Sequence, residues 1–191
     1  MGRKGSSGLS TSGGDFHGFL GFNGDPLSYS DAEHKKRLNK EDEWFGSNSN
    51  SYSWGSNLTS EEKTAIQMHV NGSGTLNEKY SKALDGAVEK FDLNKGITVF
   101  RATDNFTNAK VGEVIHESGH PSTSVVNMGN WGRDALLEID VPSGKGRGIW
   151  VGKRGEPLEH EFMLHRNASY KVKSRSVDSD GTVRLKVVMV V

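Results

Sequence analysis

Hydrophobic and polar positions follow two different spacings in the two parts of this chain. The clearest helical spacing runs over residues 75–91, where apolar side chains recur every three or four positions. After residue 96, short apolar runs alternate with turn residues such as Pro142-Ser143-Gly144, a pattern typical of β-strands. Helices followed by strands predict an α+β fold.

Two more helices are expected before residues 75–91. Residues 31–45 predict a helix with Asp31 at its N-cap. Thr59 and Glu62 have the spacing of a capping box, in which each side chain bonds the backbone N–H of the other residue. We therefore expect a helix from this point to about Val70.

The segment between these two helices has a different composition. Residues 46–57 are rich in Ser, Asn and Gly, and they predict a loop. Tyr52 and Trp54 lie within it, and we expect both rings to be held against the core.

Seven strands are expected in the second part of the chain, and the last of them ends in an apolar run from Val187 to Val191. Because this run is apolar on both faces, we place the strand centrally in the sheet. The expected strands cover residues 97–102, 122–126, 135–141, 148–152, 160–165, 169–175 and 183–191.

The first thirty residues are rich in Gly and Ser and cannot bury enough apolar surface to offset their ordering entropy. Residues 1–30 are therefore expected to be a flexible segment, and residues 31–191 one domain with a helical part over 31–91 and a sheet part over 97–191. An apolar patch in the segment is expected to dock onto the domain or onto a partner. It consists of Phe16, Phe19, Leu20 and Phe22.

Composition narrows the possible function classes. The chain has 24 basic and 24 acidic residues, and this balance argues against direct nucleic-acid binding. It has no cysteine, which excludes disulfides, thiolate nucleophiles and cysteine-based zinc sites. No stretch approaches the ~20 apolar residues of a membrane span, and no apolar run follows Met1. We expect no membrane partner and no signal peptide, so the site of action is the cytoplasm of the producing or the target cell.

His116, Glu117 and His120 match the zinc-protease pattern H-E-x-x-H. That chemistry needs both imidazoles one turn apart on a helix. Here Gly119 weakens a helix and Pro121 pushes the preceding residue towards extended backbone. We expect a polar connection between strands here, and no metal site.

Three other short motifs carry polar side chains that could form one site. Arg101 ends a strand, and a run of hydroxyl residues begins another at Ser122. Glu159 and Glu161 alternate after a turn, and on a strand both would point to one face. Two carboxylates aimed at one place cost electrostatic energy unless a site uses them.

In this order, the elements resemble the arginine-type mono-ADP-ribosyltransferases of the R-S-E class. That group includes binary-toxin ADP-ribosyltransferase exoenzymes and phage-encoded enzymes. The resemblance runs from about Leu58 to Val191. It implies two facing antiparallel-rich sheets with a helical region before them and an NAD cleft between them.

The resemblance also implies a role for each residue of the NAD side of the site. Arg101 would hold the NAD phosphates, and the backbone of Ala102 would lie near the nicotinamide amide. The family often has glycine at that second position, so Ala102 is a departure. Trp131 is the candidate aromatic residue beside the nicotinamide.

The remaining roles concern the catalytic carboxylates. By resemblance Ser122 orients the catalytic Glu161, and Thr123 and Ser124 support it. Glu159 would activate the acceptor, and a glutamate here, rather than a glutamine, implies arginine as the acceptor.

Elementary chemistry agrees with these implied roles. Cleavage of the nicotinamide–ribose bond passes through an oxocarbenium-like state, which a nearby carboxylate stabilises. The fork of an arginine side chain suits a diphosphate. The expected reaction transfers ADP-ribose from NAD to an arginine of an unidentified protein, without a metal. Alternatives are NAD hydrolysis with water as the acceptor, a noncatalytic structural or virion module, and the zinc protease.

Overall fold

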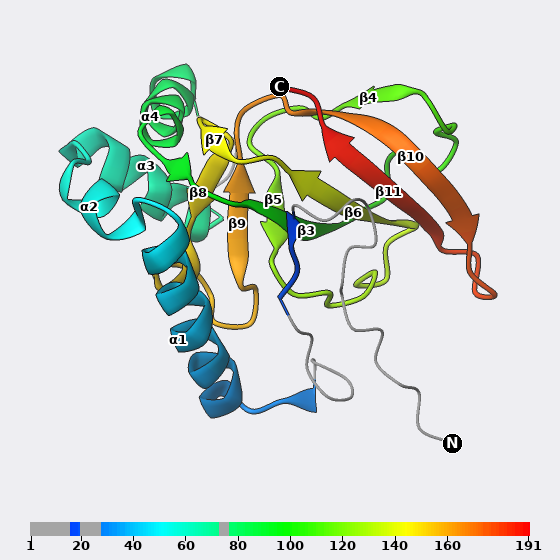
Figure 1. Cartoon of the computed structure of the whole chain (residues 1–191), viewed down its shortest axis with the longest axis horizontal. Helices are drawn as coiled ribbons and strands as arrows, with labels where there is room; N and C mark the ends of the chain where they lie inside the picture. Colours follow the sequence, from blue (N-terminus) through cyan, green and yellow to red (C-terminus); the bar gives the residue numbers. More distant parts are fainter. Residues whose placement is uncertain (1–15, 20–27, 73–76) are drawn as a thin grey trace.

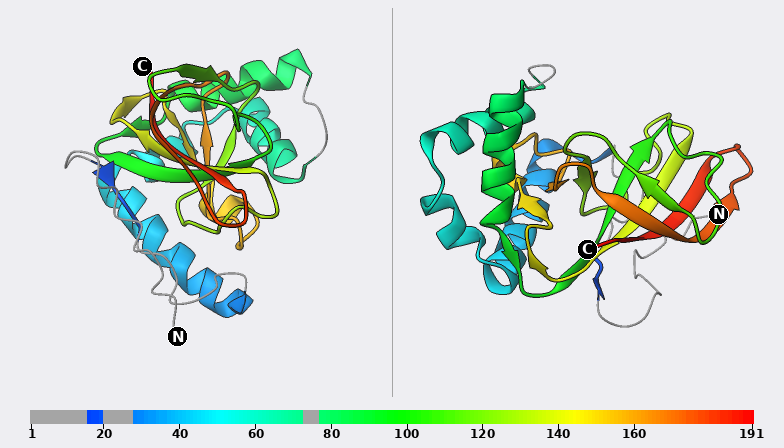
Figure 2. Two further views of the ribbon diagram at one scale, coloured as in Figure 1. Left: turned by 90° about the vertical axis from the view of Figure 1, so that its right-hand side faces the viewer. Right: turned by 90° about the horizontal axis from the view of Figure 1, so that it is seen from above.

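The computed structural model describes residues 16–19, 28–72 and 77–191. In this part of the chain, four α-helices gather at one end of the molecule beside a large, strongly bent sheet (Figure 1). Figure 2 shows the same division from two further directions. The expected α+β class, with the helices ahead of the main strands, is confirmed.

The helices begin close to where their capping residues predict. They are α1 (Asp31–Asn48), α2 (Ser51–Ser56), α3 (Ser60–Val70) and α4 (Glu78–Glu89). Thr59 and Glu62 form the expected capping box at the start of α3. The expected N-cap of α1 is wrong by one residue, because Ser30 and Glu33 form a capping box of the same kind there. Asn77 caps α4, and the expected beginning of that helix at residue 75 lies outside the described residues.

The loop expected over residues 46–57 is wrong. α1 continues to Asn48, and Ser51–Ser56 forms the short helix α2. The cause is tertiary: Trp54 is 1% exposed, and its indole Nε1 donates a 2.8 Å hydrogen bond to the carbonyl of Ala87. Packing thus overrides weak local propensity. Tyr52 is 63% exposed, so only one of the two rings is held in the core.

The strands form one hydrogen-bonded path of order β4-β10-β11-β6-β3-β5-β9-β8, and β1 pairs with β3 beside it. The pair β2–β7 lies apart from this path. The strands are β1 (Phe16–His17), β2 (Asp92–Leu93), β3 (Gly96–Thr103), β4 (Val114–His116), β5 (Ser122–Ser124), β6 (Ala135–Val141), β7 (Gly144–Lys145), β8 (Gly148–Trp150), β9 (Glu161–Leu164), β10 (Ser169–Val177) and β11 (Val183–Met189).

The two expected sheets are therefore joined into one. Their junction is narrow, because β3 and β5 share a single register pair, Phe100 with Ser124. From there β5, β9 and β8 run at a steep angle to β3, β6 and β11 (Figure 1). The pairings are antiparallel except β6–β11 and β1–β3. The bend creates the corner in which the candidate site lies.

The central position expected for the last strand is confirmed, since β11 lies between β10 and β6. Its two faces nevertheless differ. Val183, Leu185 and Val187 are buried, whereas Arg184 and Lys186 are exposed on the other face. The strand ends at Met189, before the last two residues of the expected apolar run.

Stacked aromatic rings join the helical end to the sheet. The ring of Phe45 in α1 lies 4.4 Å from that of Trp150 and 5.8 Å from that of Phe162. Phe19 packs on Phe45 at 5.7 Å, so this part of the N-terminal apolar patch docks onto the domain. Leu20 and Phe22 lie outside the described residues.

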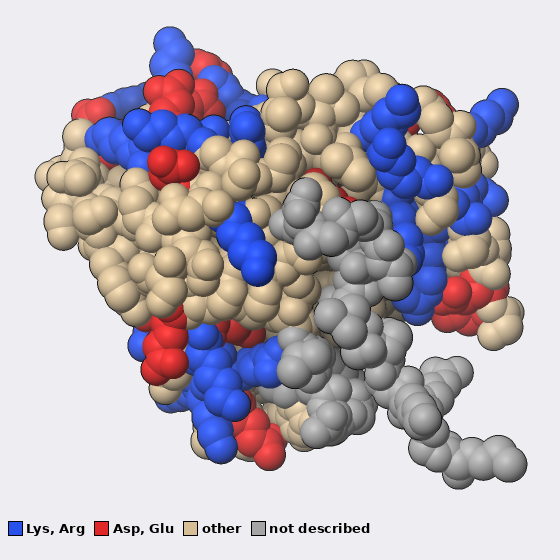
Figure 3. All heavy atoms as spheres, viewed as in Figure 1, with Lys and Arg blue, Asp and Glu red and all other residues tan. Residues whose placement is uncertain are grey.

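Figure 3 shows basic and acidic side chains interspersed at both the helical and the sheet end of one face. Among the helices that the structure describes, none is both long and apolar enough to cross a membrane.

Candidate active site

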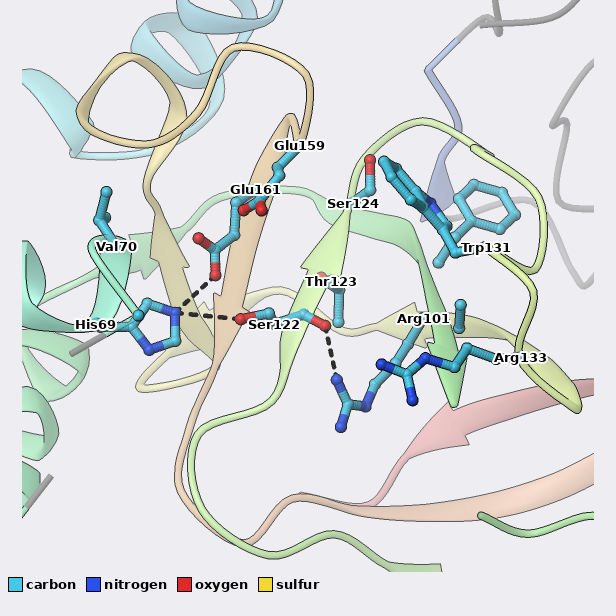
Figure 4. Close-up of a pocket in the computed structure, with 13 residues that line it drawn as sticks. His69, Val70, Arg101, Ser122, Thr123, Ser124, Trp131, Arg133, Glu159 and Glu161 are labelled. Atoms are coloured by element: carbon cyan, nitrogen blue, oxygen red, sulfur yellow. Dashed lines mark hydrogen bonds and ion pairs between the residues drawn. The ribbon is translucent and has the colours of Figure 1, made fainter. Parts of the chain in front are cut away.

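A cavity of about 430 Å³ lies in the corner between α3 and the strands β3, β5 and β9 (Figure 4). The structure brings all eight sequence-predicted site residues to its wall. They are Arg101, Ala102, Ser122, Thr123, Ser124, Trp131, Glu159 and Glu161. Five further residues of the wall were missed: His69, Val70, Gly72, Phe100 and Arg133.

Glu161 is the first residue of β9 and is only 3% exposed. Its Oε2 lies 2.7 Å from Nε2 of His69, and the same nitrogen lies 3.2 Å from Oγ of Ser122 (Figure 4). His69 therefore joins the two predicted residues. Burial of a carboxylate is costly unless it is hydrogen-bonded, and this imidazole supplies the partner.

No local pattern in the sequence indicates His69. It lies in the last turn of α3, where a histidine is commonly found because it interacts well with the helix C-terminus. Only the tertiary placement of this helix, which packs on α4, brings the imidazole to Glu161 and Ser122.

Arg101 is held from two sides at the edge of the cavity. Its Nε donates to Oε1 of Glu117 at 2.6 Å, and its Nη1 donates to the carbonyl of Ser122 at 3.0 Å. Glu117 is 8% exposed, so the ion pair is partly shielded from water. The guanidinium is thus positioned by a carboxylate that belongs to the H-E-x-x-H pattern.

The two histidines of that match have separate partners. His116 ends β4 and its Nδ1 lies 2.7 Å from Oγ of Ser169, whereas Nε2 of His120 lies 2.9 Å from Asp85. Gly119 between them has a φ of +68°. The expected connection outside a helix is confirmed, and the helical spacing that a zinc protease requires is not formed. Within residues 16–19, 28–72 and 77–191, no three His, Cys, Asp or Glu side chains are grouped to hold a metal ion.

Glu159 lies in the turn before β9, since the strand starts at Glu161 rather than at residue 160. Both carboxylates still line the cavity. Partial burial raises the pKa of Glu159, and the negative charges of Glu161 and Glu156 raise it further. A carboxyl group with a raised pKa in a cavity is typical of acid–base sites.

The short strand β5 is fastened to β9 along its length. The hydroxyl of Thr123 donates to the carbonyl of Phe162, and Ser122 and Ser124 are in register with Met163 and Glu161. Ser122 and Glu161 therefore occupy neighbouring strands, and their relative position is set by the sheet.

Trp131 stands at the mouth of the cavity in the loop after β5. It is 47% exposed and has a φ of 51°, which is uncommon for a bulky residue. Arg133 follows two positions later, and its guanidinium bonds Asp104 at 2.8 Å while it is 58% exposed. The loop thus presents an aromatic ring and a second arginine to the same cavity.

Comparison with known proteins places this geometry in a family. The sequence profile of the family described as ADP-ribosyltransferase exoenzyme matches residues 42–191. No curated protein matches the sequence.

Several solved structures share the fold. Plx2a, an ADP-ribosyltransferase toxin from Paenibacillus larvae, is 21% identical with a TM-score of 0.67, over 82% of this chain and 96% of its own. C3stau2 from S. aureus, solved with NAD, is 17% identical with a TM-score of 0.59, over 73% and 94%. The ADP-ribosyltransferase Vis, solved with agmatine, is 18% identical with a TM-score of 0.63, over 86% and 87%. The profile covers most of the chain, and the chain therefore belongs to the ADP-ribosyltransferase exoenzyme family, whose substrate is NAD.

Proposed function

We propose that this protein transfers ADP-ribose from NAD to an arginine side chain of another protein, as an enzyme of the R-S-E class. The observation that carries the proposal is the convergence of Glu159 and Glu161 on one cavity together with Arg101 and Ser122. Family membership supports ADP-ribosyl transfer, and the identity of the acceptor rests on Glu159.

Two arginines and a tryptophan make up the NAD-binding side in this proposal. Arg101 and Arg133 border the cavity and supply forked donors of the kind that bind a diphosphate. Trp131 offers a flat apolar surface to the nicotinamide, beside the backbone of Ala102. Ser122, Thr123 and Ser124 of β5 line the part of the cavity where, in this proposal, the reaction takes place.

The catalytic step relies on Glu161. The bond between the ribose C1′ and the nicotinamide nitrogen breaks, and both electrons leave with neutral nicotinamide. The carboxylate of Glu161 stabilises the oxocarbenium-like ribose, in part through the 2′-hydroxyl. His69 and Ser122 keep that carboxylate aimed at the cavity.

Glu159 acts on the acceptor. An arginine nitrogen forms the new bond to C1′, and its proton passes to Glu159 or to solvent. The crystal structure of Vis was obtained with agmatine, a compound that carries a guanidinium group, and this supports a guanidinium acceptor for the present fold. With water in place of arginine, the same centre would hydrolyse NAD.

The test measures nicotinamide release and agmatine modification in parallel. Glu161→Gln should lower both rates by ~10²–10³, the scale of one electrostatic group in a transition state. Glu159→Gln should abolish agmatine modification and leave part of the nicotinamide release. Glu43→Gln, an exposed glutamate of α1, serves as the control and should change neither rate.

Three results would contradict the proposal in different ways. Nicotinamide release without any agmatine modification by the unaltered protein would make it an NAD hydrolase. Equal loss of both rates in Glu159→Gln would remove the acceptor role. A protein that releases no nicotinamide at all would be a noncatalytic module.

A further inference from the structure

His160 separates the two carboxylates in the sequence, yet its side chain points away from the cavity. It is 0% exposed and reaches α1, where its Nδ1 lies 2.8 Å from Oε2 of Glu41. Its Nε2 lies 2.9 Å from Nδ1 of His34 on the same helix. Glu41 and His34 are each 1% exposed. The junction between the turn and β9, which carries both carboxylates, is therefore attached to α1 on the side opposite the cavity.

The backbone of His160 is also held by a hydrogen bond. Its carbonyl accepts a 3.0 Å hydrogen bond from the N–H of Val125, directly after β5. Its φ is 44°, a left-handed conformation that few non-glycine residues adopt, although histidine is among those enriched there. In this conformation Glu159 and Glu161 both line the cavity, while the side chain between them reaches Glu41.

Burial of a polar cluster of this kind costs desolvation free energy. Burial raises the pKa of Glu41, while the hydrogen bond from His160 and the positive charge of Arg37 act in the opposite direction. Well-packed apolar residues in place of a buried ion pair are often as stable or more stable. Stability alone therefore does not explain the cluster. Its place next to the segment that carries Glu159 and Glu161 indicates that it positions this segment.

We propose that Glu41 and His160, with His34 beside them, are positioning residues that hold the turn so that Glu159 and Glu161 both face the cavity. This inference rests on the proposed function of the two carboxylates. We call these three residues the brace. Its two members on α1, Glu41 and His34, precede residue 42, where the family match begins, whereas His160 lies within the match.

The brace should affect turnover more than NAD affinity. Arg101, Trp131 and Arg133 come from β3 and from the loop after β5, and the two arginines bond Glu117, Ser122 and Asp104 rather than the cluster. A displaced turn leaves these NAD-binding groups in place and misaligns the carboxylates. A misplacement of about 1 Å in a catalytic group costs up to ~10²-fold in rate.

The experiment compares Glu41→Ala and Glu41→Gln in the full chain. Glu41→Ala should lower kcat for nicotinamide release by ~10- to 100-fold, with the dissociation constant for NAD changed by less than about threefold. Glu41→Gln keeps an oxygen that accepts the hydrogen bond from His160, and it should restore most of the rate. Glu43→Ala, an exposed change on the same helix, is the matched control.

A double variant tests whether the two residues act together. Because Glu41 and His160 contact each other, Glu41→Ala combined with His160→Asn should be no slower than the more impaired single variant. Asparagine is chosen since it tolerates the left-handed backbone. Additive losses would mean that the residues act separately and would overturn the brace.

A second readout needs no activity. Backbone hydrogen exchange over residues 156–161 should accelerate in Glu41→Ala and remain unchanged in Glu43→Ala and Glu41→Gln. If Glu41→Ala does not fold, the exchange and rates of His160→Asn decide the matter, because a brace predicts faster exchange with NAD affinity retained. Unchanged exchange, or equal loss of kcat and NAD affinity, would overturn the inference. If the unaltered protein is inactive, the proposed function fails while the exchange still tests the brace.

Discussion

Nε2 of His69 lies 2.7 Å from the carboxylate of Glu161, although the two residues belong to a helix and a strand that are distant in the sequence. The imidazole is also within 3.2 Å of the hydroxyl of Ser122. It is 15% exposed and the carboxylate is 3% exposed, so the contact is largely shielded from water. The serine and the glutamate expected to cooperate in catalysis therefore share one partner that neither belongs to their motifs nor lies near them in sequence.

The first prediction concerns this partner. His69→Ala should lower kcat for nicotinamide release by about 10-fold, because a hydrogen bond to a charged group contributes ~1.5–3 kcal/mol and its loss frees the carboxylate to turn. The kcat of His69→Gln, which keeps a hydrogen-bond donor, should lie between those of the unaltered protein and His69→Ala. The control is His116→Ala, an exposed histidine away from the cavity. Unchanged steady-state kinetics in His69→Ala would show that Glu161 is held without it.

The second prediction concerns Arg101. Arg101→Lys should weaken NAD binding by about 10-fold or more, because a lysine is a point charge and lacks the fork. It also lacks the two separate nitrogens, Nε and Nη1, with which Arg101 bonds Glu117 and the carbonyl of Ser122. Isothermal calorimetry with NAD gives the measurement, and Arg175→Lys on the outer part of β10 is the control. An unaltered affinity would remove Arg101 from the phosphate site.

The third prediction concerns pH. Partial burial and the charges of Glu161 and Glu156 raise the pKa of Glu159, and in the proposed reaction only its ionised form can accept a proton from the acceptor. Transfer should therefore be lost as the pH falls through this raised pKa, at a higher pH than for an ordinary glutamate. Glu156→Gln removes one negative charge, lowers the pKa and moves the acid limb of the pH–rate profile to lower pH.

Salt supplies a check on that explanation. Glu156 is exposed, so its effect on Glu159 is screened, and the shift caused by Glu156→Gln should shrink at high ionic strength. Glu43→Gln should leave the profile unchanged. A shift towards higher pH in Glu156→Gln would contradict the assigned cause.

The fourth prediction concerns the rings that join the helices to the sheet. Phe45 is 0% exposed and stacks on Trp150, so Phe45→Ala should lower the free energy of unfolding by ~3–5 kcal/mol. Tyr52→Ala, at a ring that is 63% exposed, should change it by about 0.5 kcal/mol or less. Urea denaturation followed by circular dichroism measures both, and equal losses would mean that the ring stack is not the main junction.

The sequence by itself determined the features that depend on near neighbours. Thr59 and Glu62 predict the start of α3, because a capping box needs only two residues three positions apart. The strand expected over residues 135–141, ahead of the turn residues from Pro142, is β6 with its observed bounds. The candidate carboxylates were also found locally, since Glu159 and Glu161 form a short pattern beside a turn.

Tertiary structure decided the features that depend on distant neighbours. The short helix α2 forms where composition predicts a loop, because Trp54 is buried against α4. His69 and Glu117 reach the site only through the tertiary placement of α3 and of the connection after β4. Local spacing records which face of an element is apolar, and it does not record which other element covers that face. For this reason the motifs indicated the carboxylates, whereas only the fold revealed the side chains that hold them in place.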